Sequence, residues 1–519
     1  MSSKAAATYA NPILNADWPD PDVIEVDGVY YLVASSFNRA PGLPLLRSSN
    51  LVDWAPAGHA LPRLVPEERF SSVQRGGGVW APAIRHHAGR FWIFYPDPDQ
   101  GIFVTHADKI DGEWSSPHLL LPGLGVIDPC PLWDDDGAAY LVHGWAASRA
   151  GVKNRLSLRR MSPDARTLID DGDVVVIEGN DLPGYTTLEG PKFYKHDGYY
   201  WIFAPAGGVA TGWQSAFRSR TPYGPYEGRI VLDQGATAVN GPHQGAWVHT
   251  PGGQDWFLHF QDRGPYGRVV HLQPMTWTQD GWPVIGNHVP GESYGQPVHR
   301  HPYPLGTSSD ASSPATSDDF ARPGLGPQWH WQANPGQGWY TANGTGTLVL
   351  HAQPTTTGDL RRIPHVLGQV LPGTPTTVAT TLDASEALPG TFSGLAILGL
   401  SYGWLGIERT ATGFTLRGGT DDLDLTVRPL DGPILELSVS TTADHRARFK
   451  WRCTTTGAWH HADWEFDLSK GHWIGAEIAI FAATTRRDTG RSNVSVGPVR
   501  VTIQSAAEGR NEQLAGAGI

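Results

Sequence analysis

The 519-residue chain has few of the features that quickly assign a protein to a class. It contains only two cysteines, Cys130 and Cys453, so no disulfide framework holds its fold. No apolar run is long enough to span a bilayer, and residues 1–9 lack the apolar core of a secretory signal. Long Lys/Arg runs are absent and the formal net charge is −12, which makes nucleic acid and anionic membranes poor partners. We expect a cytoplasmic protein with a neutral or weakly charged substrate.

Helical periodicity is also nearly absent, and a strand–turn–strand rhythm replaces it. A glycine-containing turn followed by an aromatic-rich strand recurs five times, at intervals of roughly 50 to 60 residues. The five copies begin at Asp27, Ala88, Asp136, Asp197 and Gly253. Each interval is long enough for one four-stranded sheet, so the repeat predicts a five-bladed β-propeller. Turns between the copies, such as Ser48–Trp54, are expected on the outer strands.

The composition changes after Pro304. Residues 306–317 are rich in Ser and Thr and have few side chains able to enter a core, which predicts a linker. Short Thr-, Val- and Leu-rich strands follow without the earlier repeat, which predicts a β-sandwich. The expected all-β organisation is therefore a propeller over 1–305, the linker, and a sandwich over 318–519.

Three acidic residues share an unusual setting. Asp20, Asp128 and Glu189 are each followed within two residues by proline, and each precedes an aromatic-rich strand. Equivalent positions at the start of propeller blades converge on the central axis, so we expect the three carboxyls to meet at one end of it. The alternative is that they are ordinary turn residues of the repeat, which suits Asp better than Glu.

Several ordered motifs resemble those of glycoside hydrolase family 43, above all its two-domain β-xylosidases and α-L-arabinofuranosidases. They are Asn11-Pro12 with Pro19-Asp20-Pro21, Gly77–Pro82, Ile127–Pro129, Glu189–Pro191 and Tyr266–Arg268. The resemblance covers nearly the whole chain. It implies a five-bladed propeller followed by a concanavalin-like β-sandwich.

The resemblance also implies catalytic roles. Asp20 would be the general base, Glu189 the general acid, and Asp128 a third carboxylate that orients the acid and raises its pKa. An inverting glycosidase needs this division, with the acid and base roughly 6.5–9.5 Å apart. The implied activity is exo-acting release of terminal β-D-xylose from xylo-oligosaccharides. Removal of α-L-arabinofuranose from arabinoxylan or arabinan fragments is the second hypothesis, and a non-catalytic sugar-binding propeller is the third.

Other residues match substrate-binding positions of the family. Phe37 and Trp80 would wall the terminal sugar subsite, although both also suit a blade core. Arg268 would contact the bound sugar, with a surface ion pair as the alternative. Trp145 would line the pocket.

His243 falls near a family histidine on the propeller axis that binds water or a cation. The surrounding stretch is shifted by about one residue, so Gln244 competes with His243 for this role. No cofactor is expected to be required, and a structural calcium at His243 is left open. Other candidates are discounted because Asp134–Gly137 lacks the spaced Glu of a calcium loop and the histidine pairs at 86–87 and 460–461 lack partner ligands.

The resemblance implies that the sandwich contributes one loop to the pocket rim or to an oligomer interface. A homo-oligomer is therefore left open. A separate carbohydrate-binding role for the sandwich is the alternative.

Overall fold

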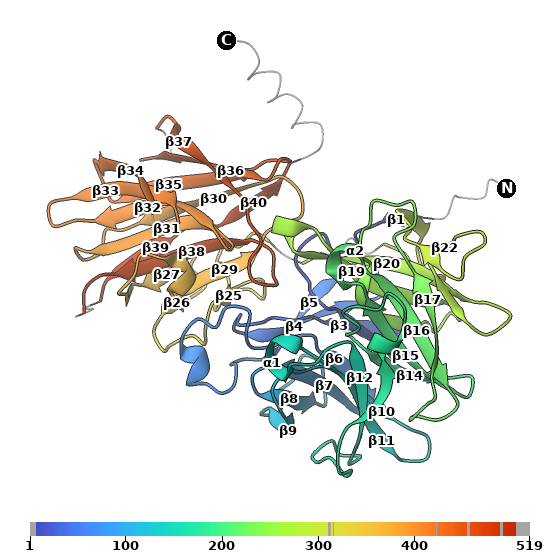
Figure 1. Cartoon of the computed structure of the whole chain (residues 1–519). Coiled ribbons are helices and arrows are strands. Elements are labelled where there is room, and N and C mark those ends of the chain that lie inside the picture. Colours follow the sequence, from blue (N-terminus) through green and yellow to red (C-terminus); the bar gives the residue numbers. More distant parts are fainter. Residues whose placement is uncertain are drawn as a thin grey trace.

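The computed structural model describes residues 7–309, 313–314, 316–421, 423–453, 457–487 and 491–504. Over these ranges the protein is all-β, with only two one-turn α-helices, α1 (Ala147–Ala150) and α2 (Gly208–Thr211), and four short 3-10 turns. Figure 1 shows a propeller (blue to green) beside a sandwich (orange to red). The predicted fold class is confirmed.

Five sheets form the blades, four of them four-stranded and one with six strands, and within each blade the four main strands are antiparallel. Blade 1 is β2 (Asp22–Val26), β3 (Val29–Val33), β4 (Gly42–Ser48) and β5 (Ala55–Leu61). Blade 2 is β6 (Ala83–His87), β7 (Arg90–Asp97), β8 (Gly101–Ala107) and β9 (His118–Pro122). Blade 3 is β10 (Val126–Trp133), β11 (Ala139–Trp145), β12 (Arg155–Met161) and β13 (Val174–Glu178). Blade 4 is β14 (Lys192–His196), β15 (Tyr199–Ala206), β16 (Trp213–Ser219) and β17 (Glu227–Leu232), extended by β23 (Gly295–Gln296) and β22 (Asn287–His288). Blade 5 is β18 (His243–His249), β19 (Asp255–Asp262), β20 (Arg268–Trp277) and β21 (Pro283–Ile285).

The recurring aromatic-rich segments are the second strands of the blades. Each follows a tight turn, and in three of them both central residues have positive φ, as in Asp27 (52°) and Gly28 (81°). Such turns match the twist of the flanking strands and favour Asp-Gly. The first strands, which precede these turns, pack against one another around the axis. The predicted outer turn at Ser48–Trp54 lies between β4 and β5, as expected.

The ring is closed between blades 5 and 1 by the first described residues of the chain. Strand β1 (Thr8–Ala10) pairs with β24 (Arg300–Pro302), which follows the last blade. The Asn11 side-chain amide donates to the carbonyls of Leu272 (2.8 Å) and Val298 (2.9 Å). Its oxygen accepts from the Leu272 N–H at 2.9 Å. Asn11 therefore ties the start of blade 1 to the third strand of blade 5.

The C-terminal domain is a sandwich of two large sheets, antiparallel except for the parallel pair of β28 and β38, with the apolar core between them. The first sheet runs β25 (His330–Trp331), β29 (Val366–Val370), β38 (Glu477–Thr484), β31 (Thr391–Leu398), β32 (Tyr402–Arg409), β33 (Phe414–Thr420) and β34 (Leu423–Leu430), with β28 (Gln353–Pro354) beside β38. The second runs β26 (Tyr340–Ala342), β27 (Leu348–His351), β39 (Asn493–Val496), β30 (Thr376–Asp383), β35 (Ile434–Thr441), β36 (Arg446–Arg452) and β37 (His460–Asp467), with β40 (Arg500–Ile503) beside β30.

The region between the domains spans the predicted linker. Strand β24 ends at Pro302 and β25 begins at His330. Within the predicted linker 306–317, residues 310–312 and 315 lie outside the described residues. The domain boundaries at 305 and 318 therefore stay predictions.

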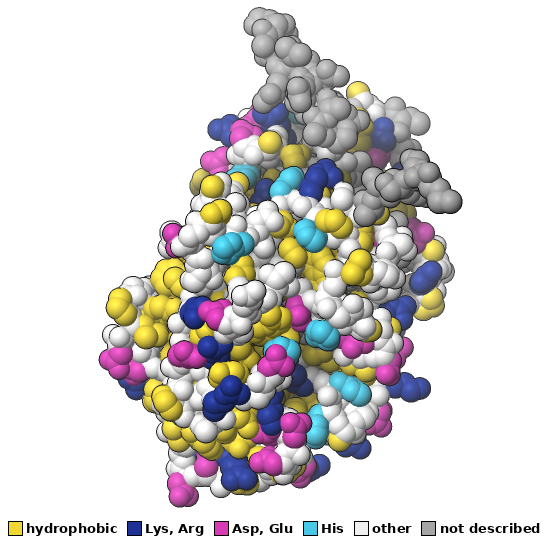
Figure 2. Space-filling model, turned by 90° about the vertical axis from the view of Figure 1, so that its right-hand side faces the viewer, with side chains coloured by type: hydrophobic (Ala, Val, Ile, Leu, Met, Phe, Trp, Pro, Cys, Tyr) yellow, Lys and Arg dark blue, Asp and Glu magenta, His cyan; other side chains and the backbone are white. Residues whose placement is uncertain are grey.

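The molecular surface carries mixed charges. Figure 2 shows basic and acidic side chains interspersed over one face of the molecule. In the described part of the chain, no helix is long and apolar enough to cross a membrane.

Buried charges join the two domains. The Arg39 guanidinium donates to Glu477 Oε1 (2.6 Å) and to Asp17 Oδ2 (3.0 Å). His330 Nε2 lies 2.7 Å from the same Glu477 oxygen, and all four side chains are less than one-tenth exposed. Burial alone would raise the pKa of Glu477, but Arg39 and His330 lower it to about 2. The propeller and the sandwich thus share one compensated charge cluster.

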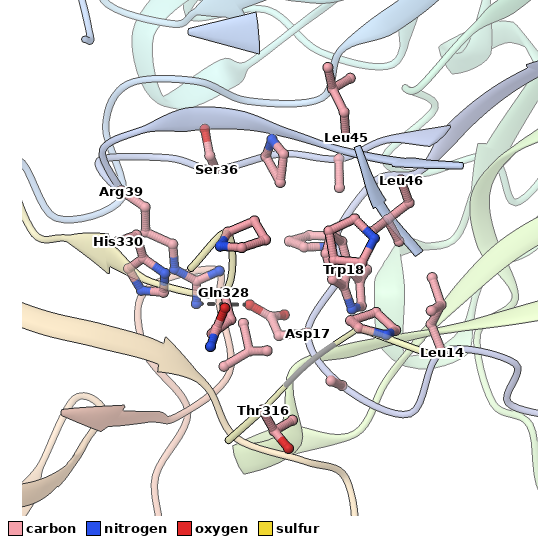
Figure 3. Close-up of a pocket in the computed structure, with 18 of the residues that line it drawn as sticks. Leu14, Asp17, Trp18, Ser36, Arg39, Leu45, Leu46, Thr316, Gln328 and His330 are labelled. Atoms are coloured by element: carbon pink, nitrogen blue, oxygen red, sulfur yellow. Dashed lines mark hydrogen bonds and ion pairs between the residues drawn. The ribbon is translucent and has the colours of Figure 1, made fainter. Parts of the chain in front are cut away.

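A pocket of 340 Å³ lies beside this cluster, between blade 1 and the sandwich. Figure 3 shows Arg39 and Asp17 joined at the pocket, with His330 and Trp18 among its lining residues. None of the three acids expected to be catalytic lines it.

We expect Arg39→Met to destabilise the protein by about 3–5 kcal/mol, because it leaves the buried Asp17 and Glu477 carboxylates without their cation. Urea unfolding followed by tryptophan fluorescence measures the change. Arg90→Met is the matched control, since Arg90 pairs with Asp108 on the surface and its loss should cost under about 1 kcal/mol. Equal effects of the two variants would contradict the role given to the buried cluster.

Candidate active site

Asp20 is held rigidly in the loop before β2. It has a φ of +54°, lies between two prolines and is 4% exposed. Its Oδ2 accepts from Ser35 Oγ at 2.5 Å, and its Oδ1 accepts from Arg268 Nη1 at 2.6 Å. Two donors therefore fix the carboxylate, and the Arg268 charge compensates it.

Asp128 lies within β10, where the pairing with β11 shifts between Ile127 and Cys130. Its φ is +55° and it is 6% exposed. Its Oδ2 accepts from the Gly190 N–H at 2.8 Å, which joins the motif of Asp128 to that of Glu189. Such an irregularity in a strand re-aims a side chain, here toward the next blade.

Glu189 precedes β14 and is the most accessible of the three acids. Its side chain is 26% exposed, and its Oε1 lies 3.1 Å from His243 Nε2. Gly190, with a φ of +60°, follows it, and a Cβ there would lie 2.9 Å from the Gln244 side chain. The conformation and the lack of space both require glycine after this acid.

The charges of Glu189 and Asp20 both act on Asp128, as expected for three carboxyls in one site. Burial and, to a smaller extent, the charges of Glu189 and Asp20 raise the pKa of Asp128 from 3.8 to about 8. The Gly190 N–H and Lys192 act in the opposite direction. Asp128 therefore keeps its proton near neutral pH, next to the Glu189 side chain.

The two aromatic residues expected to wall the pocket lie together. Their ring centroids are 6.4 Å apart, and Phe37 forms an isolated bridge with Val79. Phe37 is 2% exposed, whereas Trp80 is only half-buried and donates its indole N–H to the Gly76 carbonyl at 2.8 Å. The Arg149 guanidinium lies 5.4 Å from the Trp80 ring. Of the two, Trp80 is therefore the one with an accessible ring.

Trp145 ends β11 in the same blade as Asp128. It is half-buried, and its indole N–H donates to Ser157 Oγ at 2.9 Å. The preceding residue, Gly144, packs close to both acids, since a Cβ there would lie 3.6 Å from Asp128 Oδ2 and 3.8 Å from Glu189 Cα. Trp145 is therefore the residue directly after Gly144, which borders Asp128 and Glu189.

His243 and Gln244 both lie at this end of the axis, and they have different contacts. His243 Nε2 faces Glu189, while its Nδ1 and the Gln244 side-chain amide nitrogen have no hydrogen-bond partner among the described residues. The described residues contain no cluster of three or more His, Cys, Asp or Glu side chains that would hold a metal ion. Calcium binds six to eight oxygens, and one imidazole with one carboxylate does not supply them. Calcium at His243 stays a prediction, and no chemical step is assigned to it.

The sandwich contributes residues 470–475 to the rim of the site. The Trp473 ring lies 6.1 Å from Trp80 and is 47% exposed, and Trp473 has a φ of +70°. The Ala476 N–H donates to the Pro265 carbonyl at 2.6 Å, which anchors the loop on blade 5. Arg268 and Trp473 line the same 220 Å³ cavity.

Trp473 and Ser35 were not among the residues expected from the sequence. A large aromatic residue between Gly471 and Gly475 was the available signal for Trp473. Ser35 carried no signal, since nothing in its sequence surroundings points to a distant carboxylate.

The arrangement suits general acid–base chemistry. The arginine-held carboxylate of Asp20 can accept a proton from water, and Glu189, the exposed carboxyl beside Asp128, can donate one when it is protonated. Half-buried and exposed tryptophan rings flank this end of the propeller and can stack on an apolar ring face.

Comparison with known proteins gives concordant matches for both domains. The family model described as Glycosyl hydrolases family 43 matches residues 9–283, and that described as Beta xylosidase C-terminal Concanavalin A-like domain matches residues 317–494. A putative beta-xylosidase of Xylanibacter ruminicola is 40% identical over 367 residues, which cover 70% of this chain and 66% of that protein. A non-reducing end alpha-L-arabinofuranosidase of Bacteroides ovatus is 30% identical over 366 residues, 67% of this chain and 66% of that protein.

The fold is also similar to a solved structure. A xylan beta-1,4-xylosidase from Bacillus halodurans superposes with a TM-score of 0.84 at 22% identity, over 95% of this chain and 99% of that one. At this identity the likeness supports the fold alone.

We expect Asp128→Asn to change how stability depends on pH. The raised pKa of Asp128 makes the folded protein hold a proton that the unfolded chain loses above about pH 4, so the wild-type unfolding free energy falls as pH rises toward 8. The variant has no titrating group at this position and lacks this loss. Its unfolding free energy, compared with that of the wild type, should therefore be about 4 kcal/mol higher at pH 8 than at pH 5. Urea unfolding at each pH measures the difference. Asp108→Asn, at an exposed site, is the control, and a constant difference for Asp128→Asn would contradict the raised pKa.

Proposed function

Because the chain belongs to glycosyl hydrolase family 43, we propose that it is an exo-acting, inverting glycosidase that releases terminal β-D-xylose from xylo-oligosaccharides. The observation that carries the proposal is the contrast between the carboxyls. The Asp20 carboxylate is held by an arginine, whereas Asp128, whose pKa is raised to about 8, lies buried beside the more exposed Glu189.

In the proposed reaction Asp20 is the general base. It takes a proton from a water molecule, and the water oxygen attacks the anomeric carbon from the face opposite the leaving oxygen. Arg268 and Ser35 hold the carboxylate in orientation without protonating it. Because one displacement occurs, a β-xyloside yields α-xylose.

Glu189 is the proposed general acid. It donates its proton to the glycosidic oxygen as the bond to the anomeric carbon breaks. Its side chain is the accessible member of the pair, since Asp128 is almost wholly buried. When Asp128 is ionised, its negative charge disfavours ionisation of Glu189 and so supports the acid. The Gly190 N–H holds the Asp128 carboxylate in position.

The proposed substrate is a short neutral oligosaccharide. Trp80 and Trp473 offer aromatic surface at the site, and residues 470–475 close one side of it. A loop at this position favours a pocket for a chain end over an open cleft. The net charge of −12 agrees with an uncharged ligand.

Hydrolysis of α-L-arabinofuranosides is the second candidate. The Bacteroides ovatus relative that bears this name supports it. A non-catalytic sugar-binding propeller is disfavoured, because binding alone needs no carboxyl kept protonated near neutral pH.

We expect an aryl β-D-xyloside to be hydrolysed at least about tenfold faster, in kcat/KM, than the matching aryl α-L-arabinofuranoside. Proton NMR during xylobiose hydrolysis should show α-xylose before mutarotation. The opposite preference would support the second candidate, and a first product with the β configuration would contradict inversion. Turnover of neither substrate would favour the non-catalytic hypothesis.

Variants of the two proposed catalytic residues should separate their roles. Asp20→Asn should lower kcat by about 10³-fold or more on every substrate, because water activation is lost in each case. Glu189→Gln should cost a similar factor on xylobiose but far less on 2,4-dinitrophenyl β-xyloside, whose leaving group needs no proton. Circular dichroism verifies the fold of each variant. Equal losses on both substrates for Glu189→Gln would contradict its role as the acid.

A further inference from the structure

A second cavity lies on the sandwich, outside the site described above. It has a volume of 700 Å³ and is lined by residues of β31, β32, β33 and β34 of the first sheet. Loop residues 354–358 and 485–487 also line it. None of the residues assigned to the active site does so. The sandwich therefore has a hollow of the size of a small-molecule site that the proposed function does not use.

Two glycines make room for this cavity. Gly394 of β31 and Gly406 of β32 lie directly opposite each other in the register, and Trp404 and Glu408 flank Gly406 on the same face of the sheet. A Cβ at Gly394 would lie 2.9 Å from Cε3 of Trp404, so the indole ring packs against this glycine. Because neither glycine has a side chain, the face stays hollow between Trp404 and Glu408.

A row of charged side chains crosses the cavity. Arg417 Nη1 donates to Glu408 Oε2 at 3.1 Å, and Arg417 Nη2 donates to both carboxylate oxygens of Asp424, at 2.8 and 2.7 Å. The second oxygen of Glu408 has no hydrogen-bond partner among the described residues, and this side chain is 26% exposed. Arg417 thus fixes Glu408 in place while one of its acceptor atoms stays open to a ligand.

Trp404 supplies an open donor beside this row. The residue is 6% exposed, and its ring packs against Phe392 and Phe481 at centroid distances of 6.3 and 5.4 Å. Its indole N–H has no hydrogen-bond partner in the part of the chain that the structure describes, and protein atoms do not enclose it. A buried tryptophan normally pairs this group. Because Trp404 lines the cavity, its N–H is free to donate to a ligand there.

The charges around the cavity balance. Three carboxylates and three guanidinium groups line it, namely those of Glu408, Asp421 and Asp424 and those of Arg417, Arg486 and Arg487. An ion of either sign would meet as many like charges as opposite ones, which favours an uncharged ligand. Open donors and acceptors lie side by side, and a sugar hydroxyl can both donate and accept. The lining therefore suits a neutral carbohydrate.

A short chain of contacts links the cavity to the rim of the active site. Arg361 pairs at 3.4 Å with Asp421, which lines the cavity, and donates to the Leu400 carbonyl at 2.8 Å. Leu400 in turn lines the 220 Å³ cavity that contains Arg268 and Trp473. Arg361 and Leu400 thus connect the two cavities.

We propose that the sandwich cavity is a non-catalytic binding site for a neutral oligosaccharide. The Trp404 N–H donates to an oxygen of the sugar, and the open oxygen of Glu408 accepts from a hydroxyl. A site linked to the active-site rim raises the concentration of chain ends near the proposed catalytic residues. The choice of a xylan-derived ligand rests on the proposed function, whereas the site itself does not.

Electrophoresis of the native, full-length protein through gels that contain soluble xylan tests the proposal. Asp20→Asn is the background, because it should bind xylan without hydrolysing it, and saturating xylose keeps the active site occupied. Xylan should slow this protein, and the dependence on xylan concentration gives a dissociation constant. Adding Glu408→Gln should raise that constant at least about tenfold, because an amide replaces the charged acceptor. Adding Trp404→Phe should raise it about fivefold, because only a neutral donor is lost.

Glu436→Gln is the matched control. Glu436 lies in β35 of the second sheet, its side chain is 19% exposed, and it pairs with Arg452 at 2.6 Å. Its substitution therefore removes a similar ion pair from the sandwich away from the cavity, and it should leave the dissociation constant unchanged. In the otherwise unmodified enzyme, Glu408→Gln should leave kcat/KM on an aryl β-xyloside unchanged.

Several outcomes would overturn the proposal. One is the absence of retardation when xylose is present, and another is equal retardation of the Glu408→Gln and Glu436→Gln proteins. A third is a change from dimer to monomer in Glu408→Gln on size-exclusion chromatography without a change in retardation, since the face would then be an interface between copies. Should circular dichroism show that Trp404→Phe does not fold, Glu408→Gln still decides.

Hydrolysis by the wild-type enzyme scores the proposed function separately. If retardation depends on Glu408 and no aryl glycoside is hydrolysed, the proposed function fails and the binding site stands. If the glycosides are hydrolysed and retardation does not depend on Glu408, only the binding site is overturned.

Discussion

The ion pair between Arg268 and Asp20 is the contact on which the site depends, because it joins the last blade to the first. Arg268 begins β20, and its backbone N–H donates to Asp17 Oδ1 at 2.9 Å. Asp17 is bound by Arg39, which is bound in turn by Glu477 of the sandwich. Closure of the ring, docking of the second domain and orientation of the proposed base are therefore one connected set of buried contacts.

The part of the site that contains Asp128 and Glu189 depends on two carboxyls being held close together. Asp128 and Glu189 come from blades 3 and 4, and the Gly190 N–H joins them. Burial and the nearby Glu189 charge raise the pKa of Asp128, and Glu189 is the more exposed of the two carboxyls.

Much of the fold and of the candidate site was predictable from the sequence, because it depends on local sequence patterns. The Asp27-Gly28 turns with their aromatic strands gave the blade repeat, and the proline-flanked settings of Asp20, Asp128 and Glu189 marked positions that converge on an axis. Contacts between distant segments were not predictable. Nothing in the sequence near Ser35 points to Asp20, and nothing near Trp473 points to Trp80. The resemblance assigned Phe37 to the wall of the sugar pocket, but the sequence did not reveal that this side chain is almost wholly buried.

The central claim is that Asp20 and Glu189 act from opposite faces of one sugar. A crystal structure of the Glu189→Gln variant with bound xylobiose tests it most directly. The account predicts the residue 189 amide within hydrogen-bond distance of the glycosidic oxygen. It also predicts a water molecule between Asp20 and the far face of the anomeric carbon. A sugar bound with both side chains on the same face, or bound away from Asp20, would contradict it.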